Sequence, residues 1–457
     1  MLRFVEPLWL APLAGSVASA LGHTQSESSR VTYLLIVLVG VVLGAFINWA
    51  IYSWAWFPRA ISPWSKADDR ALPRTWSDRI PVFGWFGLRR ETEIHGRIFW
   101  LRPMLIELLF GPMLAGLFWW EVIELGLLPS GAAAGMPPGM LVVTQQWMLI
   151  MYLGHAMLMT LLMIATFIDF DEQTIPDAVT VTGTLLALTL HVIAAMMMPQ
   201  IGSPLCLPWA TEGGLAAVMF TAPAPIETKW LTPMGLIVGE AIFAAWCFAL
   251  ANRRWIMRKG FVKAIQFFAA GLVKYETMLL GRFRTKVWKL LVAIWLTGSV
   301  AIAAVYFGLG GSAWLALLSA LVGVGLGGGQ IWAVRVFAKL GLGKEAMGFG
   351  DVTLMAMVGG FLGWQAALFV FFLAPFTAIA IVLASWLLTG NRMLPFGPYL
   401  AAGAVLTVVF WDAIWNQWGA GVFILGPLIG AVLMLALVAM CALLFLFRVV
   451  EQKIFAQ

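Results

Sequence analysis

The chain has 457 residues, of which 62% are hydrophobic and only 11% are charged. Water-soluble proteins carry roughly 25% charged residues, so this composition excludes a soluble globular protein and predicts a protein of the lipid bilayer. The 28 basic and 22 acidic residues leave a positive balance that lies mostly between apolar runs. It therefore indicates membrane topology and not a nucleic-acid partner. Three separate cysteines, with no CxxC pair, predict neither disulfides nor a metal site.

Eleven apolar runs have the length, or nearly the length, of a membrane-spanning helix, since a span needs about 20 apolar residues. The run at 352–365 is shorter, and it could be a half-helix paired with the next run through a turn within 359–363. We therefore predict an all-α polytopic membrane protein with about eleven transmembrane helices. The runs lie near residues 32–57, 103–127, 146–168, 178–198, 233–252, 290–309, 313–338, 352–365, 367–389, 397–416 and 419–447.

Positive charge alternates between the segments that connect these runs. Segment 58–102 holds nine Lys or Arg and 253–289 holds ten, whereas 128–145 and 308–312 hold none. Cationic loops stay on the cytoplasmic side, so we predict a multi-pass protein of the cell inner (cytoplasmic) membrane, with its N-terminus outside and its C-terminus in the cytoplasm. Residues 1–20 fit either a cleaved signal or part of an extracytoplasmic segment.

This topology divides the chain into six parts. The insertion contains one extra span and a basic cytoplasmic stretch, and the two parts of the membrane core lie on either side of it. The parts are an extracytoplasmic segment (1–31), the first transmembrane helix (32–57), a basic cytoplasmic loop (58–102), a first core part (103–198), the insertion (199–289) and a second core part (290–457).

Two acidic clusters lie on the predicted cytoplasmic rim. One spans 167–177, with Asp169, and the other is Gly348-Phe349-Gly350-Asp351. Two carboxylates that meet in a partly desolvated site cannot both ionise easily, so one keeps its proton and the pair can activate water without a metal or cofactor. Gly348 and Gly350 are expected to allow backbone conformations closed to other residues and a close approach beside Asp351.

Several segments, in the same order, resemble the type IV prepilin peptidases, a family of membrane aspartyl proteases with a Gly-x-Gly-Asp motif. They include Gly44-Ala45-Phe46-Ile47-Asn48, Ile168-Asp169 with Ile175-Pro176-Asp177, Gly348-Phe349-Gly350-Asp351-Val352 and Leu394-Pro395-Phe396-Gly397-Pro398.

The resemblance implies that Asp169 and Asp351 are the catalytic pair. Asp169 is preferred to Asp171 because it stands seven residues before Pro176, as in the family. Asp171 and Asp177 are then possible neighbours of the pair. The implied activity is removal of the leader peptide from a prepilin-like substrate, a type IV pilin or a type II secretion pseudopilin. Many members then N-methylate the new N-terminus with S-adenosylmethionine.

The chain departs from the family in its first loop. Typical members carry two CxxC pairs there, but this loop has no cysteine, and 62–67 and 89–95 stand where the pairs would be. We therefore predict no zinc in the loop, and S-adenosylmethionine is a cofactor only if the methyltransferase activity is retained.

An alternative from another class is a non-catalytic membrane transporter or secretion-assembly component on a degenerate peptidase fold. In that case Glu107, Glu240 and Asp412, which fall in or at the ends of predicted spans, would form an ion path. The sequence predicts neither the identity of the substrate nor the oligomeric state.

Overall fold

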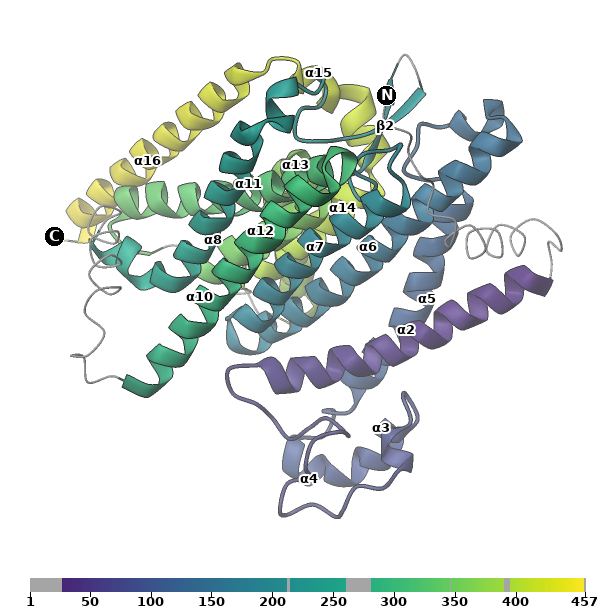
Figure 1. Cartoon of the computed structure of the whole chain (residues 1–457). Helices are drawn as coiled ribbons and strands as arrows, with labels where there is room; N and C mark the ends of the chain where they lie inside the picture. The colour runs from purple at the N-terminus through teal and green to yellow at the C-terminus, as the bar shows by residue number, and fades with distance from the viewer. Residues whose placement is uncertain (1–26, 212–213, 260–280, 346, 390–394, 456–457) are drawn as a thin grey trace. The chain divides into compact units, whose positions relative to one another are not determined.

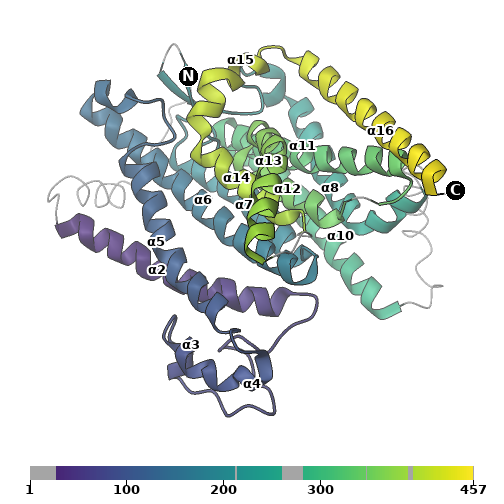
Figure 2. The same cartoon turned by 180° about the vertical axis from the view of Figure 1, so that it is seen from behind.

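The computed structural model describes residues 27–211, 214–259, 281–345, 347–389 and 395–455, which are mostly helical (Figure 1). The view from behind shows the same elements (Figure 2). By its contacts the chain divides into unit 1, up to Gly126 with Ser130–Tyr152, and unit 2, Leu127–Pro129 with the residues from Leu153 onward. Most of the predicted N-terminal segment and of the basic stretch in the insertion falls outside the described residues.

Unit 1 contains two long helices and a compact loop region. In Figure 1 the short helices α3 and α4 form a small cluster near one end of α2 and α5. The elements are α2 (Glu27–Trp54), the turn η1 (Ser77–Arg79), α3 (Gly84–Gly87), η2 (Leu88–Glu91), α4 (Thr92–His95), α5 (Leu101–Phe118), η3 (Trp119–Ile123), η4 (Ala132–Gly135) and the first part of α6 (Pro138–Glu172).

Helices α2 and α5 cross at backbone contact. A Cβ added at Gly44 would lie 2.7 Å from the Glu107 Cα, so only glycine fits the crossing. Asn48 Nδ2 donates to the Pro103 carbonyl oxygen at 2.8 Å and to Glu107 Oε1 at 2.9 Å, and the Val82 N–H donates to Glu107 Oε2 at 2.6 Å. Glu107 is therefore held in a local hydrogen-bond network that joins the two helices and the loop.

The loop between α2 and α5 is held by a buried ion pair. Arg74 Nη2 lies 2.9 Å from Glu91 Oε2, and the two side chains are only 4% and 1% exposed. Arg74 also donates to the carbonyl oxygens of Ala60 at 2.6 Å and Ser65 at 3.0 Å, and to that of Ser62. One guanidinium therefore connects the first part of the loop to its last part.

A second ion pair makes the stability of the loop pH-dependent. The hydrogen bond from Arg90, 2.6 Å long at its shortest, lowers the pKa of Asp78 from 3.8 to about 2. Because the folded pKa is depressed, the stabilisation is present above the unfolded value and is lost as the pH falls through about 2.

Asp78→Asn is therefore expected to lower the free energy of unfolding of the loop by about 1–3 kcal/mol at neutral pH. The difference from wild type should shrink as the pH falls from about 4 through about 2, since Asp78 becomes protonated first in the unfolded state and then in the folded state. Limited proteolysis of the loop in increasing urea measures this. The matched control is Asp69→Asn, whose partner Lys66 and own side chain are 89% and 91% exposed and which should change little. Equal losses in both variants would contradict the prediction.

Unit 2 holds the rest of α6 and the remaining elements. They are α7 (Asp177–Met197), the strands β1 (Pro208–Thr211) and β2 (Gly214–Ala217), η5 (Thr228–Leu231), α8 (Pro233–Lys259), α10 (Gly281–Ala304), η6 (Val305–Leu309), α11 (Gly311–Leu342), α12 (Phe349–Leu362), α13 (Trp364–Thr389), α14 (Gly397–Val409), η7 (Asp412–Gly419), α15 (Ala420–Phe423) and α16 (Pro427–Phe455).

Helices α11 and α12 pack backbone to backbone along a seam of glycines. A Cβ added at Gly323 would lie 2.0 Å from the Gly359 carbonyl oxygen, and one at Gly327 would lie 2.4 Å from that of Met355. Such contacts are possible only with small residues, as in other closely packed membrane helices. The seam therefore fixes the position of α12 along α11.

The all-α polytopic fold is confirmed, with a correction to the number of spans. Among the described residues, nine helices are long and apolar enough to cross a membrane, and α14 with 412–423 makes a tenth only as a pair bent by 72°. The predicted run at 352–365 is the 14-residue α12, too short for a full span, and it ends at Gly363. The antiparallel hairpin of β1 and β2 was not predicted.

Candidate active site

Asp169 lies in the last turn of α6, where a short connection leads into α7. The helix ends because Gln173 adopts a left-handed conformation with φ of 53°, and its N–H donates to the Asp169 carbonyl oxygen at 2.8 Å. Asp169 is 4% exposed, and its Oδ2 accepts a hydrogen bond of 3.1 Å from the Gly397 backbone N–H. The end of α6 thus presents a buried carboxyl group to the start of α14.

Asp351 lies in the first turn of α12 and is 7% exposed. Its carboxyl group interacts with the backbone of Gly348, the N-cap residue, and lies close enough to Asp169 and Arg335 for electrostatic interaction. The positive end of the helix dipole favours negative charge at this position. The structure therefore brings together two buried aspartates that are 182 residues apart in the sequence.

The two glycines before Asp351 differ from their predicted role. Gly348 has φ of −68° and ψ of 156°, and neither Gly348 nor Gly350 is in the left-handed region. The expectation of a backbone closed to other residues is therefore wrong, and Gly350 belongs to a helix and not to a loop. Gly350 does allow a close approach, since a Cβ there would lie 2.9 Å from the Ile175 Cβ. The connection between α6 and α7 thus packs directly against the turn that carries Asp351.

Gly397 makes a similar close contact with Asp169. A Cβ added at Gly397 would lie 2.5 Å from Asp169 Oδ2 and 3.0 Å from Ile175 Cδ1. The motif at 395–398 marked Gly397 in the sequence, but it did not predict the contact of Gly397 with Asp169. Gly397 is therefore a positioning residue, because it donates to the carboxylate and leaves room for it.

Gly397→Ala is expected to displace the Asp169 carboxyl group and to lower the rate of any reaction at the acid pair about 100-fold, the usual effect of a shift of about 1 Å. The rate of leader processing in membranes measures this, and thermal unfolding shows whether the variant stays folded. The control is Gly430→Ala, because a Cβ there meets nothing within 4 Å. A wild-type rate for Gly397→Ala would show that the contact does not position Asp169.

Asp171 and Asp177, the predicted neighbours of the pair, are both exposed. Asp171 follows Asp169 by two positions in a helix that turns about 100° per residue, so the two side chains leave the helix on nearly opposite sides. Asp177 is the first residue of α7, where a carboxylate favours the helix dipole. Of the four acidic residues within 169–177, only Asp169 is buried.

Arg335 of α11 is a charged residue of the site that the sequence alone did not identify. It is 6% exposed, its Nη2 lies 3.2 Å from Glu345 Oε2, and its Cζ lies 5.7 Å from the centre of the Phe349 ring. Among the described residues, its Nε and Nη1 have no hydrogen-bond partner. A buried cation beside Asp351 stabilises negative charge on the acid pair.

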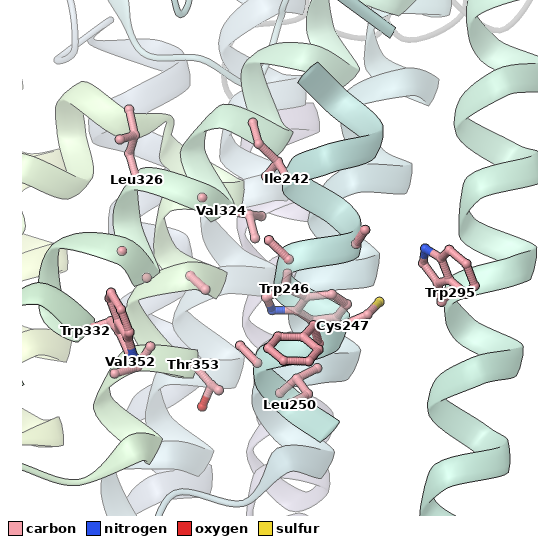
Figure 3. Close-up of a pocket in the computed structure, with 18 of the residues that line it drawn as sticks. Ile242, Trp246, Cys247, Leu250, Trp295, Val324, Leu326, Trp332, Val352 and Thr353 are labelled. Atoms are coloured by element: carbon pink, nitrogen blue, oxygen red, sulfur yellow. The ribbon is translucent and has the colours of Figure 1, made fainter. Parts of the chain in front are cut away.

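A separate apolar cavity of about 740 Å³ lies between α8, α10, α11 and α12. Phe349, Val352 and Thr353 line it, whereas Asp351 does not, so the cavity and the acid pair lie on different faces of α12. Figure 3 shows several of its lining side chains, among them Trp246, Leu250, Trp295, Trp332, Val352 and Thr353.

The acid pair has the chemistry of a water-activating site. Two neighbouring buried carboxyl groups share a proton, so one can accept a proton from water while the other polarises a carbonyl group. Within the part of the chain that the structure describes, no group of three or more His, Cys, Asp or Glu could hold a metal ion. Fold and site together define a polytopic all-α membrane protein with a buried pair of aspartates.

Comparison with known proteins finds a similarity in one segment of the chain. Residues 287–383, which include Asp351 but not Asp169, match the type IV leader peptidase family. The prepilin leader peptidase/N-methyltransferase of Pseudomonas putida is 33% identical over 115 residues, which is 24% of this chain and 38% of that protein. The protein of the same name from Burkholderia pseudomallei (strain 1026b) is 36% identical over 97 residues, 21% of this chain and 31% of that protein.

Residues 287–383 are thus similar to the type IV leader peptidase family, and the similarity extends to about a quarter of the chain. The match spans less than two fifths of the length of these curated relatives. No solved structure matches the chain.

Proposed function

We propose that this chain is a membrane aspartic endopeptidase that removes the leader peptide from prepilin-like proteins, either type IV pilins or pseudopilins of type II secretion. The observation that carries the proposal is the pair of buried carboxyl groups of Asp169 and Asp351, which come from segments far apart in the sequence. The similarity of residues 287–383 to the type IV leader peptidase family supports it, since relatives of this segment bear the name prepilin leader peptidase/N-methyltransferase.

In the proposed reaction, the ionised carboxylate of the pair takes a proton from water as the water oxygen attacks the scissile carbonyl carbon. The protonated partner donates a hydrogen bond to the carbonyl oxygen. Collapse of the tetrahedral intermediate breaks the C–N bond, the proton taken from water passes to the leaving amine, and the pair again shares one proton. Arg335 contributes a fixed positive charge beside the developing negative charge.

Cleavage at the cytoplasmic face of the inner membrane is part of the proposal. One support is the positive charge of segments 58–102 and 253–289, which favours the cytoplasmic side of the membrane. The other is that both aspartates lie at helix ends, which the predicted topology places on the same side. The proposed proteolysis requires no cofactor.

N-methylation of the new N-terminus would be a second activity, with S-adenosylmethionine as the methyl donor. The names of the relatives include it, but this chain lacks the cysteine pairs that the family typically carries in its first loop. We therefore propose the peptidase activity alone.

The test is co-expression of a prepilin-like substrate with this chain in cells that lack their own prepilin peptidase. Mass spectrometry of the substrate should show loss of the leader and an unmethylated N-terminus. An intact leader, with the chain present in the membrane, would contradict the peptidase proposal. A product with the leader removed and a methylated N-terminus would contradict only the proposal that the chain has no methyltransferase activity.

The alternative, a transporter or assembly component, predicts an ion path through Glu107, Glu240 and Asp412. Glu107 accepts hydrogen bonds from Asn48 and Val82, and Asp412 Oδ1 accepts one of 2.6 Å from Asn416 Nδ2. Both therefore have local structural partners, and no observation favours the ion path over the peptidase.

A further inference from the structure

The loop region of unit 1 has an exposed cluster of aromatic side chains around one arginine. Arg79 Cζ lies 4.8 Å from the centre of the Trp76 ring and 5.5 Å from that of Trp64. The two tryptophans are 77% and 52% exposed, and Ile80, next to Arg79, is 52% exposed. We call Trp64, Trp76, Arg79 and Ile80 the Trp–Arg patch.

Large exposed apolar side chains in a folded segment mark an interaction surface. The patch is not an ordinary solvated face, since two tryptophans stack on the same guanidinium. Tryptophan and arginine share one preferred environment, the boundary between hydrocarbon and lipid headgroups, where the ring is half-buried and the cation meets phosphate.

The charges of the loop fit an anionic partner. Residues 58–100 contain eight basic and five acidic residues. Four of those acids, Asp68, Asp69, Asp78 and Glu91, already pair with basic residues of the same loop. Among the described residues, Arg79 has no acidic partner within salt-bridge distance. Arg79 is half-buried, and its buried Nε has no hydrogen-bond partner among the described residues, so no acidic group of the loop neutralises the cation of the patch.

The covalent connections of the loop hold it near a bilayer. It starts just after α2 ends at Trp54 and finishes where α5 begins at Leu101, and both helices are long and apolar enough to span a membrane. Trp56 and Phe57, directly after α2, are 76% and 70% exposed, as expected for an aromatic belt at the interface. A loop with both ends at the interface meets lipid headgroups at high local concentration.

We propose that the Trp–Arg patch is a lipid-binding surface, which inserts Trp64 and Trp76 at headgroup depth and binds anionic lipid phosphate through Arg79. This inference does not depend on the peptidase activity. It assigns to the loop a fixed orientation on the membrane surface, held by side chains that take no part in the buried ion pairs.

The test places an environment-sensitive fluorophore at Ser77→Cys, an exposed position within the patch sequence, in the full chain in lipid nanodiscs. Cys441 is replaced by Ala, since the other two cysteines are buried. The matched control carries the label at Glu93→Cys, also exposed in the same loop. Lipids with a nitroxide at the headgroup should quench the Ser77 label more than the Glu93 label. The difference should grow when phosphatidylglycerol replaces part of the phosphatidylcholine, and shrink in high salt.

Arg79→Gln should weaken lipid binding of the patch about fivefold, the effect of one surface cation. Trp76→Ser should also reduce quenching at Ser77. Protease resistance of the loop checks that each variant is folded, and the salt dependence of the wild type provides a measurement that needs no variant. Equal quenching at Ser77 and Glu93, or quenching that Arg79→Gln leaves unchanged, overturns the proposal. So does absence of lipid quenching with a spectral shift on addition of a prepilin-like protein, which would make the patch a protein-docking surface.

Discussion

Asp169→Asn and Asp351→Asn are each expected to abolish processing of a prepilin-like substrate. Asparagine keeps the shape of the side chain but can neither accept the proton of water nor share one with its partner. Acid–base groups contribute about 10²–10⁴-fold to a rate, and the two residues act as a unit, so either loss alone should bring cleavage below detection.

The matched control for this pair is Asp171→Asn, which removes an exposed carboxylate two residues from Asp169. We expect it to retain cleavage within a few-fold of wild type. Immunoblots of the substrate, with the amount of each variant in the membrane measured in parallel, give the comparison. Processing by both Asp169→Asn and Asp351→Asn would show that the acid pair is not catalytic. Loss of cleavage in Asp171→Asn but not in Asp169→Asn would show that Asp171, and not Asp169, is the first acid of the pair.

The acid pair illustrates how far a sequence can identify a site. The spacing to Pro176 selected Asp169 over Asp171, and the structure buries only the first. A helical period explains this difference, because neighbours two positions apart face opposite sides. The residues that surround the pair could not be predicted from the sequence. Arg335 and Gly397 lie on other helices, and burial created by contacts between distant segments has no local signal.

The membrane helices were predictable because a span is encoded locally, in about 20 consecutive apolar residues. Two elements that were not predicted, the β1–β2 hairpin and the bend after α14, depend on contacts between residues far apart in the sequence. The Trp411 indole Nε1 donates to the Pro208 carbonyl oxygen at 2.5 Å, and the Ala210 N–H donates to Asn416 Oδ1 at 3.0 Å. These bonds tie β1 to the region where the chain bends after α14. Neither the hairpin nor the broken helix could be read from hydropathy.

The first loop departs from the pattern of the type IV prepilin peptidases in a way that the structure explains physically. The sequence has no cysteine at 62–67 or 89–95, where the family typically carries its two pairs. In this loop the Arg74 guanidinium donates to the carbonyl oxygens of Ser62 and Ser65 on one side and to the Glu91 carboxylate on the other. Thiolate ligands for zinc are absent there, so these residues do not fit that metal. A buried ion pair connects the two segments instead.

Arg74→Met is therefore expected to destabilise the loop strongly, by about 3–5 kcal/mol, because it removes the guanidinium partner of the buried Glu91 carboxylate. Glu91 Oε2 then has only His95 Nε2 beside it, at 3.3 Å. The substitution also leaves the carbonyl oxygens of Ala60 and Ser65 without their donor, and that of Ser62 with only the Ser65 N–H. Urea-dependent proteolysis of the loop in the full chain measures the loss. The control is Arg70→Met, whose side chain is 72% exposed in its pair with Asp68 and which should cost little.

Two further measurements distinguish a loop held by an ion pair from a loop held by a metal ion. Arg74→Met with Glu91→Leu should recover part of the lost stability, since removing both charges of a buried pair costs less than removing one. A chelator should leave wild-type loop stability unchanged, whereas a zinc-held loop would unfold. If Arg74→Met resembles Arg70→Met, the buried pair does not hold the loop. If a chelator makes the wild-type loop sensitive to protease, a metal contributes despite the missing thiolates.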